Sequence, residues 1–378
     1  MAGYYQIRLK EPTGSLVAII DDYRELSFDK IVNEIGSAVV FINGYDPKTS
    51  LFMLDGQLEV YRRDVTLGID WYLEWEGFIR DFTYALDADG DYTFTANGVS
   101  YMHLLQRHIV AYKAGVSQTI KSDYAETVMK EFVSENCGSD ALIANGRIRD
   151  GDFTGFSVEP DGGLGAVWSG QRSYTIVLEV IKEIAKSTGM DFDVVGIGDG
   201  LFEFRTYFPY LGTDRSNNGV NQSTGLNTAG NSPIIFNPLL GNVTDIEYSV
   251  ARKDEVTVSL VAGQGQGEDR VIVVTEASTI ADSPLNDIEF YGDARNTNND
   301  DDLISQGEAV LAEKQFRETF VFTPLQTTEY AYGKNYYHGD FVTGQFLTLG
   351  SVDKRIMRVS ISMKDGSETI ELELGDVT

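Results

Sequence analysis

The stretch WYLEWEGFIRDFTYALDADGDYTFTA (residues 71–96) carries the clearest structural signal in this sequence. Residues 71–85 are rich in aromatic and β-branched side chains, which favour extended strands. Asp89-Gly90 follows, and Tyr, Phe and Ala then alternate with Thr over residues 92–96. Asp-Gly between two such segments is typical of a hairpin, because both central positions of a type I′ turn need a positive φ. The sequence therefore predicts a β-hairpin here.

A hairpin of similar design is predicted at the other end of the chain. Residues 355–363 and 369–374 are strand-like, and Asp365-Gly366 lies between them. We therefore expect residues 233–378 to form a second β domain that resembles the first, residues 1–112.

One helix is expected inside the second β domain, from about residue 303 to residue 319. Asp300, Asp301 and Asp302 precede it, and acidic residues before a helix start are favoured by the helix dipole. The same three acids could bind calcium, but the spaced oxygen ligands of an EF-hand are absent. A solvated helix cap is the favoured interpretation.

The middle of the chain, residues 113–210, differs from both ends. Apolar residues recur every four positions from Tyr124 to Phe132, which predicts a helix with one apolar face. Asp123 precedes this helix as its expected cap. A second helix is predicted over residues 173–189, and two short strands follow it. We interpret this region as a small α+β domain.

Residues 211–232 are polar and low in complexity, and too few are apolar to offset the entropy of ordering them. They are expected to form an exposed loop near a partner or near the exit of a tube. The predicted fold class is thus β-rich α+β, with two similar β-barrel-like domains and an inserted small α+β domain. A chain of 378 residues is long enough for several domains.

The charge of the chain is strongly acidic. There are 58 Asp and Glu residues against 30 Lys and Arg residues, which gives a formal net charge of −28. Such a surface repels nucleic acid and anionic membranes, because both are bound through Lys and Arg. The acids either keep the protein soluble or form a surface along which DNA passes without adhering.

Several classes of site and segment are not expected. Cys137 is the only cysteine, so an internal disulfide or a cysteine metal cluster cannot form. Residues 1–10 lack the apolar core of a signal peptide. The sequence also contains no run of about 18 apolar residues, so no membrane span is predicted. The glycosylation patterns at Asn221 and Asn242 are interpreted as chance.

No catalytic, metal-binding or cofactor-binding residue is predicted. His103 and His108 are five residues apart, which misses the spacing of a helical metal pair, and His338 stands alone. Gly263 and the two alternate glycines after it are followed by Glu268-Asp269-Arg270 and a strand, so they are expected to connect two strands rather than to hold a phosphate.

The remaining candidates are acidic and aromatic residues. Asp87, Asp89 and Asp91 surround a predicted turn, where acids are common, although a glycosidase pair among the many carboxylates stays open. Trp71 and Trp75 are four apart, so on a regular strand both lie on one face. They are interpreted as core or interface aromatics, and a sugar-binding platform is the alternative.

The segment Tyr332-Gly-Lys-Asn-Tyr-Tyr-His-Gly-Asp-Phe-Val342 resembles a "YG-x-D-Y-x-x-GD-x-V" signature near the end of siphophage tail-tip hub proteins. That family is similar to the baseplate hub of contractile-tailed phages. Asp293-Ala-Arg295, the region 307–314, Trp75-Glu-Gly-Phe-Ile79 and Leu104-Leu-Gln-Arg-His-Ile-Val110 also resemble segments of the family in the same order. The sequence departs from this signature at two positions: Asn335 stands where the family commonly has an acid, and His338 stands where it commonly has an apolar residue.

The resemblance implies a structural protein without enzymatic activity. It implies a homotrimeric ring that closes the tail tube, presents six near-equivalent units, adapts sixfold to threefold symmetry and lets DNA pass at ejection. The implied partners are a distal tail protein or tail tube ring, the tape measure protein and other tail-tip or fibre proteins, with no specific binding of nucleic acid and no cofactor. The implied location is the tail tip of the virion, after assembly in the bacterial cytoplasm.

Two other functions are kept open. One is a peripheral tail protein that binds carbohydrate or another receptor through aromatic residues, and the other is a tail-associated cell-wall hydrolase. A hub forms a central ring whereas a receptor-binding protein lies at the periphery, and a turnover assay on cell-wall material identifies a hydrolase.

Overall fold

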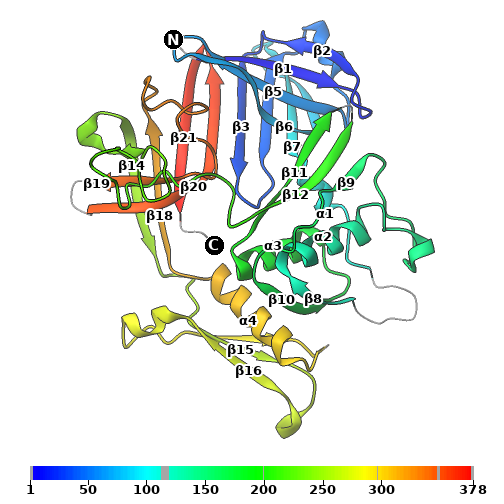
Figure 1. Ribbon diagram of the computed structural model, residues 1–378. Coiled ribbons are helices and arrows are strands. Elements are labelled where there is room, and N and C mark those ends of the chain that lie inside the picture. The colour runs from blue at the N-terminus through cyan, green and yellow to red at the C-terminus, as the bar shows by residue number, and fades with distance from the viewer. Residues whose placement is uncertain (1–2, 112–118, 199, 296, 347–349, 376–378) are drawn as a thin grey trace.

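The computed structural model describes residues 3–111, 119–198, 200–295, 297–346 and 350–375. Its largest element is a sheet of 13 strands to which both ends of the chain contribute (Figure 1). The strands of the N-terminal half are β1 (Tyr4–Lys10), β2 (Leu16–Ile20), β3 (Glu25–Ile31), β4 (Ser37–Asn43), β5 (Gln57–Asp64), β6 (Ile69–Leu86) and β7 (Tyr92–Ser100). They lie in the order β3-β4-β7-β6-β5-β1-β2.

The C-terminal half adds the other strands of this sheet. They are β13 (Ile235–Phe236), β14 (Val243–Ala251), β18 (Arg317–Pro324), β19 (Phe341–Phe346), β20 (Gly350–Lys364) and β21 (Ser367–Gly375). The order β14-β18-β21-β20-β19 repeats, strand for strand, the order β3-β4-β7-β6-β5 of the N-terminal half, and every neighbour in both series is antiparallel. The expected similarity of the two β regions is therefore present in their topology.

The two halves are joined through one pair of strands. Strand β3 pairs antiparallel with β20, with Phe28 opposite Ile361, so the sheet continues from one half into the other (Figure 1). Buried apolar side chains of both halves, including Phe28, Phe94, Phe320 and Ile361, pack into one hydrophobic core. The two ends of the chain therefore stabilise each other by apolar burial.

Both predicted hairpins are present, but their turns differ. Asp365 and Gly366 both have a positive φ, 50° and 74°, and form a two-residue turn between Lys364 and Ser367. In the β6–β7 hairpin only Gly90 has a positive φ, so the expected type I′ turn is wrong there. The reason is local: the Asp87 carboxylate accepts hydrogen bonds from the N–H groups of Asp89 and Asp91 and holds a longer loop.

The middle of the chain forms an α+β unit with a core of its own. Its elements are α1 (His103–Gln106), β8 (Thr119–Tyr124), α2 (Ala125–Asn136), β9 (Phe156–Val158), β10 (Val167–Arg172), α3 (Val177–Thr188), β11 (Asp191–Gly198) and β12 (Leu201–Tyr207). Helix α3 ends at Gly189 in a left-handed conformation, as expected. The expected cap of α2 is wrong, because the Asp123 carboxylate accepts from the adjacent Tyr124 N–H and not from the helix.

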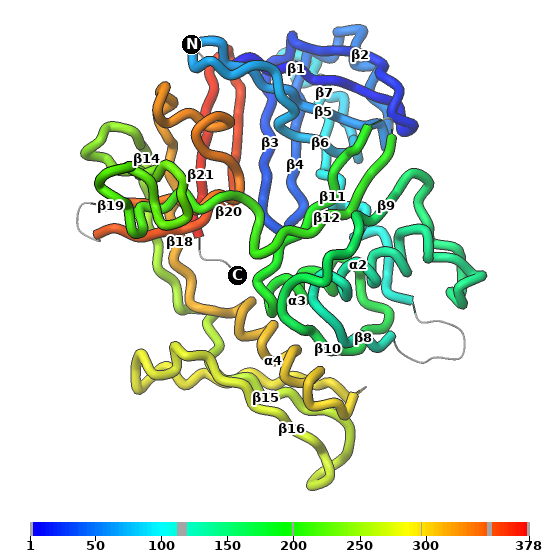
Figure 2. Tube along the Cα trace, in the orientation of Figure 1, coloured from blue at the N-terminus to red at the C-terminus, as the bar shows by residue number. Residues whose placement is uncertain are grey.

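A third, smaller unit interrupts the C-terminal half. It consists of β15 (Val258–Ala262), β16 (Ile272–Glu276), β17 (Glu289–Asp293) and α4 (Asp300–Glu313), and Figure 2 shows it apart from the large sheet, with α4 beside α3. The helix begins and ends earlier than the expected 303–319. Asn299 caps the Asp301 N–H, and strand β18 already begins at Arg317.

Short 3-10 helices complete the chain: Pro47–Leu51, Ile143–Asn145, Pro238–Leu240, Gly267–Asp269 and Ser278–Asp282. No helix among the described residues is long and apolar enough to cross a membrane. The predicted boundary between residues 112 and 113 lies outside the described residues, and the other domain boundaries stay a prediction.

Candidate functional site

The segment that carries the resemblance, residues 332–342, lies where the two halves of the large sheet meet. Tyr332 is buried, and its hydroxyl donates a hydrogen bond of 2.8 Å to Glu74 on β6. Glu74 is the extra residue of a β-bulge, because Trp75 pairs with Val60 and Leu73 pairs with the next residue of β5, Tyr61. The bulge turns the Glu74 carboxylate into the junction, where it meets Tyr332.

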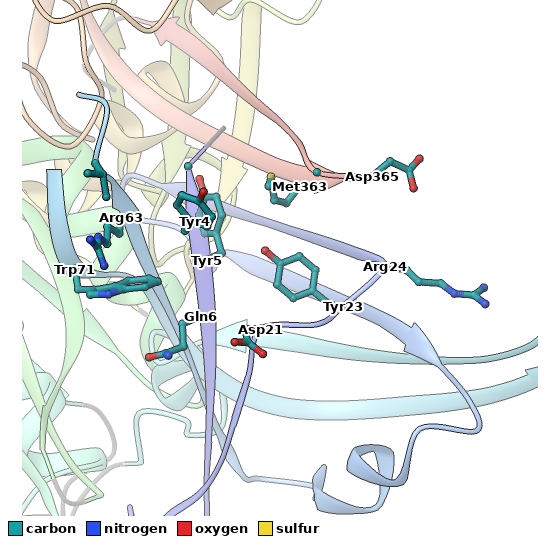
Figure 3. Close-up of a pocket in the computed structure, with 13 residues that line it drawn as sticks. Tyr4, Tyr5, Gln6, Asp21, Tyr23, Arg24, Arg63, Trp71, Met363 and Asp365 are labelled. Carbon is teal, nitrogen blue, oxygen red and sulfur yellow. The ribbon is translucent and has the colours of Figure 1, made fainter. Parts of the chain in front are cut away.

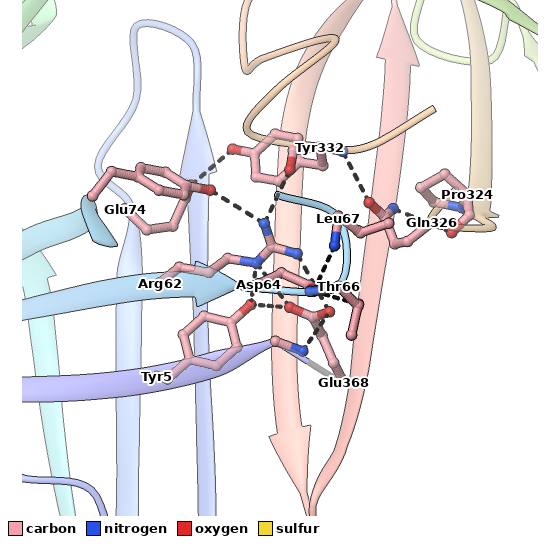
Figure 4. Close-up of polar contacts among 12 residues, drawn as sticks. Tyr5, Arg62, Asp64, Thr66, Leu67, Glu74, Pro324, Gln326, Tyr332 and Glu368 are labelled. Atoms are coloured by element: carbon pink, nitrogen blue, oxygen red, sulfur yellow. Dashed lines mark hydrogen bonds and ion pairs between the residues drawn. The ribbon is translucent and has the colours of Figure 1, made fainter. Parts of the chain in front are cut away.

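A buried arginine connects the same segment to both ends of the chain (Figure 4). Arg62 on β5 donates to the Tyr332 carbonyl at 3.0 Å and to the Glu368 carboxylate on β21 at 2.8 Å. Its Nε also donates to the Tyr5 hydroxyl at 2.9 Å. Since the Arg62 side chain is completely buried, these contacts satisfy a charge that water cannot reach.

A second buried arginine brings in the α+β unit. Arg355 on β20 donates to the Gly339 carbonyl at 3.0 Å and to the Leu211 carbonyl at 2.9 Å, and it forms an ion pair with buried Asp191 at the start of β11. Asp191 also accepts from Asn33, which follows β3, at 2.7 Å. All three parts of the chain are therefore fixed to one another at the junction.

The two departures from the signature fit this structural role. The Asn335 side-chain oxygen accepts the Ala331 N–H at 2.9 Å, a bond that a carboxylate can also accept. His338 contacts the Met357 carbonyl at 3.3 Å, and burial lowers the pKa of its imidazole to about 3. His338 is thus a neutral packing residue at neutral pH.

Asp340, the acid of the signature, holds the polar segment 211–232. Its carboxylate accepts the Thr213 N–H at 2.7 Å and pairs with Arg215 at 3.0 Å. Farther along, buried Asn227 donates to the carbonyls of Asp214 and Ser216, each at 3.0 Å. The segment is free of helices and strands and has an exposed tip, as expected, but its two ends are folded onto the junction.

A polar cavity of about 200 Å³ lies between the large sheet and the α+β unit. Glu76 and Asp193 are among its lining residues, and Glu76 accepts the Gly196 N–H at 2.8 Å. Burial raises the pKa of Glu76 to about 7 and that of Asp193 to about 6. Beside the junction, burial therefore shifts the pKa of two carboxyl groups toward neutral pH.

A larger depression, about 910 Å³, lies on the outer side of the junction. Figure 3 shows Tyr4, Tyr23 and Trp71 around it, with Met363 and Asp365 of the β20–β21 hairpin at its rim. It is formed by residues of both halves, so it is a surface of the same junction.

The comparisons with known proteins agree with this architecture. Over residues 6–376 the chain matches the family model described as Siphovirus ReqiPepy6 Gp37-like protein. The chain belongs to this siphovirus family. No match to the chain is found among curated protein sequences.

Three solved structures share the fold of this Gp37-like chain. A tail protein from Neisseria meningitidis MC58 has a TM-score of 0.58 at 13% identity and covers 99% of this chain and 97% of its own. The 43 kDa tail protein of prophage MuSo2 from Shewanella oneidensis has a TM-score of 0.56 at 12% identity, with 98% of each chain covered. Prophage tail protein gp18 from Listeria monocytogenes EGD-e has a TM-score of 0.53 at 11% identity, and the match covers 98% of this chain and 94% of that protein.

These comparisons confirm the resemblance at the level of the family and the strand-rich fold class. The Gp37-like chain has the fold of phage tail proteins. At such low identity the solved structures support the fold alone, so the specific assembly is treated below as a proposal.

The histidines and the cysteine of the Gp37-like chain do not converge on a site. His103 accepts a hydrogen bond from Arg107 at 3.0 Å, His108 packs against Phe153, and both have a pKa lowered mainly by burial. Burial also raises the pKa of the Cys137 thiol to about 12, so it is a poor nucleophile. Among the described residues no group of three or more His, Cys, Asp or Glu side chains is placed to hold a metal ion.

Two of the weaker candidates behave differently from expectation. Trp71 is 39% exposed whereas Trp75 is 3% exposed, so the expectation that both lie on one face is wrong; the Glu74 bulge shifts the alternation by one residue. Asp302 is not a solvated cap residue, because it is buried and pairs with Arg172 at 2.8 Å. That pair connects α4 to the α+β unit.

The other candidates are found in the connections where they were predicted. Asp87 and its neighbours form the loop of the β6–β7 hairpin, and the glycines 263–267 lie between β15 and β16. The residues that the sequence did not single out are Arg62, Glu74, Asp191, Arg355 and Glu368. The available signal was weak: a charged residue at a position where the strand alternation requires an inward side chain.

Proposed function

We propose that this siphovirus protein is the hub of the tail tip, a homotrimeric ring that closes the tail tube and lets DNA pass at ejection. The observation that carries the proposal is the repeated strand order of the two halves, β3-β4-β7-β6-β5 and β14-β18-β21-β20-β19. Three copies of a chain with two equivalent halves present six similar units, which can match a sixfold tube while keeping threefold symmetry.

The face of the large sheet opposite the core suits the wall of a DNA channel. Where the α+β unit leaves it uncovered, this face carries many small neutral and acidic side chains: Ser27, Thr83, Thr95, Asn97, Ser360, Ser362, Thr369 and Glu371. The apolar Val39 and Phe41 lie on the same face, as do Arg358 and Lys364, which pair with Asp29 and Glu25. The cations of this wall are already paired with carboxylates, so few are free to bind phosphate groups and a duplex can move along it. The net charge of −28 per chain adds repulsion at short range.

The copy number of the chain tests the ring. We expect native mass measurement of the purified chain or of a tail-tip complex to give a trimer, and quantification of tails to give three copies per particle. A chain that is monomeric in mature tails, or present in six copies, contradicts the proposal.

The proposed role is structural, and the absence of catalysis stays a prediction. Purified protein should release nothing from peptidoglycan, polysaccharide or peptide substrates. Turnover that is lost on replacing one Asp or Glu, with the fold intact, identifies a hydrolase instead. The proposed partners are a distal tail protein or tube ring, the tape measure protein and other tail-tip or fibre proteins, in the virion and during assembly in the host cytoplasm.

The receptor-binding alternative has one supporting residue. Trp71 is partly exposed beside Arg63, whose guanidinium lies 5.8 Å from the ring centre, but Trp75 is buried and cannot extend a sugar platform. Labelled chain at the periphery of the tail, rather than on its axis, would favour this function over the hub.

A further inference from the structure

The repeated strand order can be aligned residue by residue. Strand β6 carries a bulge at Arg80 in its pairing with β7, and strand β20 carries a bulge at Met357 in its pairing with β21. Counting from the bulges, Phe82 is equivalent to Val359 and Tyr84 to Ile361. These residues occupy the same positions in their hairpins.

The alignment extends across each half of the sheet. In the N-terminal half a row of paired residues runs through Phe28, Ala38, Gly98 and Ile79. The equivalent row in the C-terminal half runs through Tyr248, Phe320, Leu374 and Ile356. Strand β14 is thus the counterpart of β3, and Tyr248 is the counterpart of Phe28.

Only one of the two equivalent junctions is occupied inside the chain. The second part of β20 pairs with β21 on one side and with β3 on the other. Its counterpart, residues 81–86 of β6, pairs with β7 alone among the described strands, and β14 pairs with β18 alone. Each chain therefore has one strand edge like that of β3 and one like that of β20, and both are open.

At the open edge of β6, the side chains on the core face of the sheet are apolar and exposed. Phe82, Tyr84 and Leu86 are 37%, 41% and 64% exposed, whereas their counterparts Val359 and Ile361 are each 1% exposed because β3 covers them. On β14, Val250 is 54% exposed. Long apolar strand edges favour pairing with another strand, and soluble proteins usually protect them.

We infer that β14 of one copy pairs antiparallel with residues 81–86 of β6 in the next copy, in the register of the internal β3–β20 pairing. Because Asp29 is opposite Ser360 and Lys30 is opposite Val359 inside the chain, Ser249 is opposite Thr83 of the next copy and Val250 is opposite Phe82. The contact is head-to-tail, since its two sides are different surfaces, and it closes only in a ring. This inference rests on the proposed trimer and specifies how its copies join.

Internal ion pairs are replaced by apolar contacts at this edge. The β3–β20 junction carries Lys364–Glu25 at 2.5 Å and an Arg358–Asp29 pair. The equivalent positions between copies hold Asp87 with Thr244 and Asp81 with Ser249, which cannot form ion pairs. Apolar burial around Phe82, Tyr84 and Val250 therefore supplies the attraction between copies.

Cysteine cross-linking tests the register. We expect the double variants Thr83→Cys/Ser249→Cys and Phe82→Cys/Val250→Cys to yield disulfide-linked dimers and trimers, and nothing larger, after mild oxidation of the assembled protein. Two adjacent residue pairs are used because the Cα–Cα distance of directly opposed residues in an antiparallel pairing alternates between wider and closer. At least one of the two pairs should therefore fit the geometry of a disulfide. Cys137 is buried and is present in every variant.

The matched control is Thr83→Cys/Val250→Cys, which reuses the same substitutions one residue out of register. Its two thiols lie on opposite faces of the sheet, so cross-linking should be lower by ~10-fold or more. A trimer by native mass in which neither matched pair links, or in which the control links equally, overturns the inferred pairing and leaves the ring intact. A folded monomer that never links overturns both the pairing and the ring.

Discussion

Arg62 and Arg355 are both completely buried, and each joins segments that are far apart in the sequence. Arg62 connects β5 to β21 and to the Tyr332 carbonyl, and Arg355 connects β20 to Asp191 of the α+β unit. A buried ion pair contributes little net stability when complete, but removal of one partner leaves an uncompensated charge. These residues therefore fix the relative position of the halves more than they stabilise either half.

Arg62→Met should accordingly lower the free energy of unfolding by about 3–5 kcal/mol, because it leaves the buried Glu368 carboxylate without its ion-pair partner. Chemical denaturation monitored by circular dichroism measures this loss. The matched control is Arg24→Met, which removes an arginine from the exposed pair with Asp91 at 3.0 Å and should change the free energy of unfolding far less than Arg62→Met does. Equal losses in the two variants would show that Arg62 is not a junction residue.

Glu76 makes stability depend on pH. Burial raises its pKa to about 7 from the ordinary 4.5, with further raising by Asp193 and Glu59 and lowering by the Gly196 N–H and Lys10. The folded chain then holds a proton that the unfolded chain releases, so this contribution to stability falls as pH rises through that window. Glu76→Gln can keep the Gly196 hydrogen bond without the charge.

We expect Glu76→Gln to gain stability relative to the parent as pH rises from about 4.5 to about 7, by roughly 1–3 kcal/mol. Denaturation curves at several pH values measure this difference. His338 makes stability rise with pH and Asp193 makes it fall, but both groups are present in the variant and in the parent, so their contributions largely cancel in the difference. Glu289→Gln, on the exposed strand β17, is the control and should follow the parent at every pH. A parallel shift of Glu76→Gln at all pH values would exclude the proposed titration.

At the scale of the elements, local patterns predicted that the hairpins and helices exist, but not the turn of the β6–β7 hairpin, the cap of α2 or the bounds of α4. The Asp365-Gly366 turn and the helix stop at Gly189 follow from single residues with a positive φ. The β3–β20 pairing could not be predicted, since 329 residues separate Asp29 from Arg358 and no local pattern fixes a register across that distance. The Glu74 bulge was missed for a related reason: an inserted residue is visible only when the partner strand is known.

The polar segment 211–232 shows the same limit. Its composition correctly predicts an exposed tip, but side chain–backbone hydrogen bonds order the rest. Asp340 and Thr343, which are 127 and 126 residues away, accept the N–H groups of Thr213 and Asn217, each at 2.7 Å. Asn227 is buried and donates to two carbonyls, while its own oxygen accepts the Asn231 N–H at 2.9 Å. A loop can therefore be anchored without an apolar core when its amide groups are fully used.

Asn227→Ala should lower the free energy of unfolding by about 1–3 kcal/mol, because it leaves the carbonyls of Asp214 and Ser216 and the Asn231 N–H without this side chain. Asn221→Ala, in the exposed tip of the same segment, should change stability by no more than about 0.5 kcal/mol. Thermal unfolding of the two variants measures the contrast. If Asn227→Ala is as neutral as Asn221→Ala, the Asn227 hydrogen bonds do not order the segment.

At the scale of the whole molecule, the acid excess and the sheet geometry bear on the same question. The core face of the large sheet is apolar and shared by both halves, so a channel in a ring of three copies has to be lined by the opposite face. That face has Glu371 exposed among serine and threonine residues. The charge of the wall can therefore be changed there without disturbing the core.

Glu371→Lys changes the charge by two units per chain on the proposed channel wall. Each added lysine can neutralise a phosphate, so the variant ring should bind duplex DNA with an affinity that falls steeply with salt, and phage carrying it should eject DNA more slowly. The effect should be strongest below physiological ionic strength, where the Debye length exceeds about 8 Å. Glu268→Lys makes the same charge change at the exposed connection between β15 and β16, away from the large sheet, and should leave ejection unchanged. Equal ejection rates in both variants, with the trimer intact, would place Glu371 outside the channel; a slower rate for Glu371→Lys alone would identify the polar face of the sheet as the surface along which DNA moves.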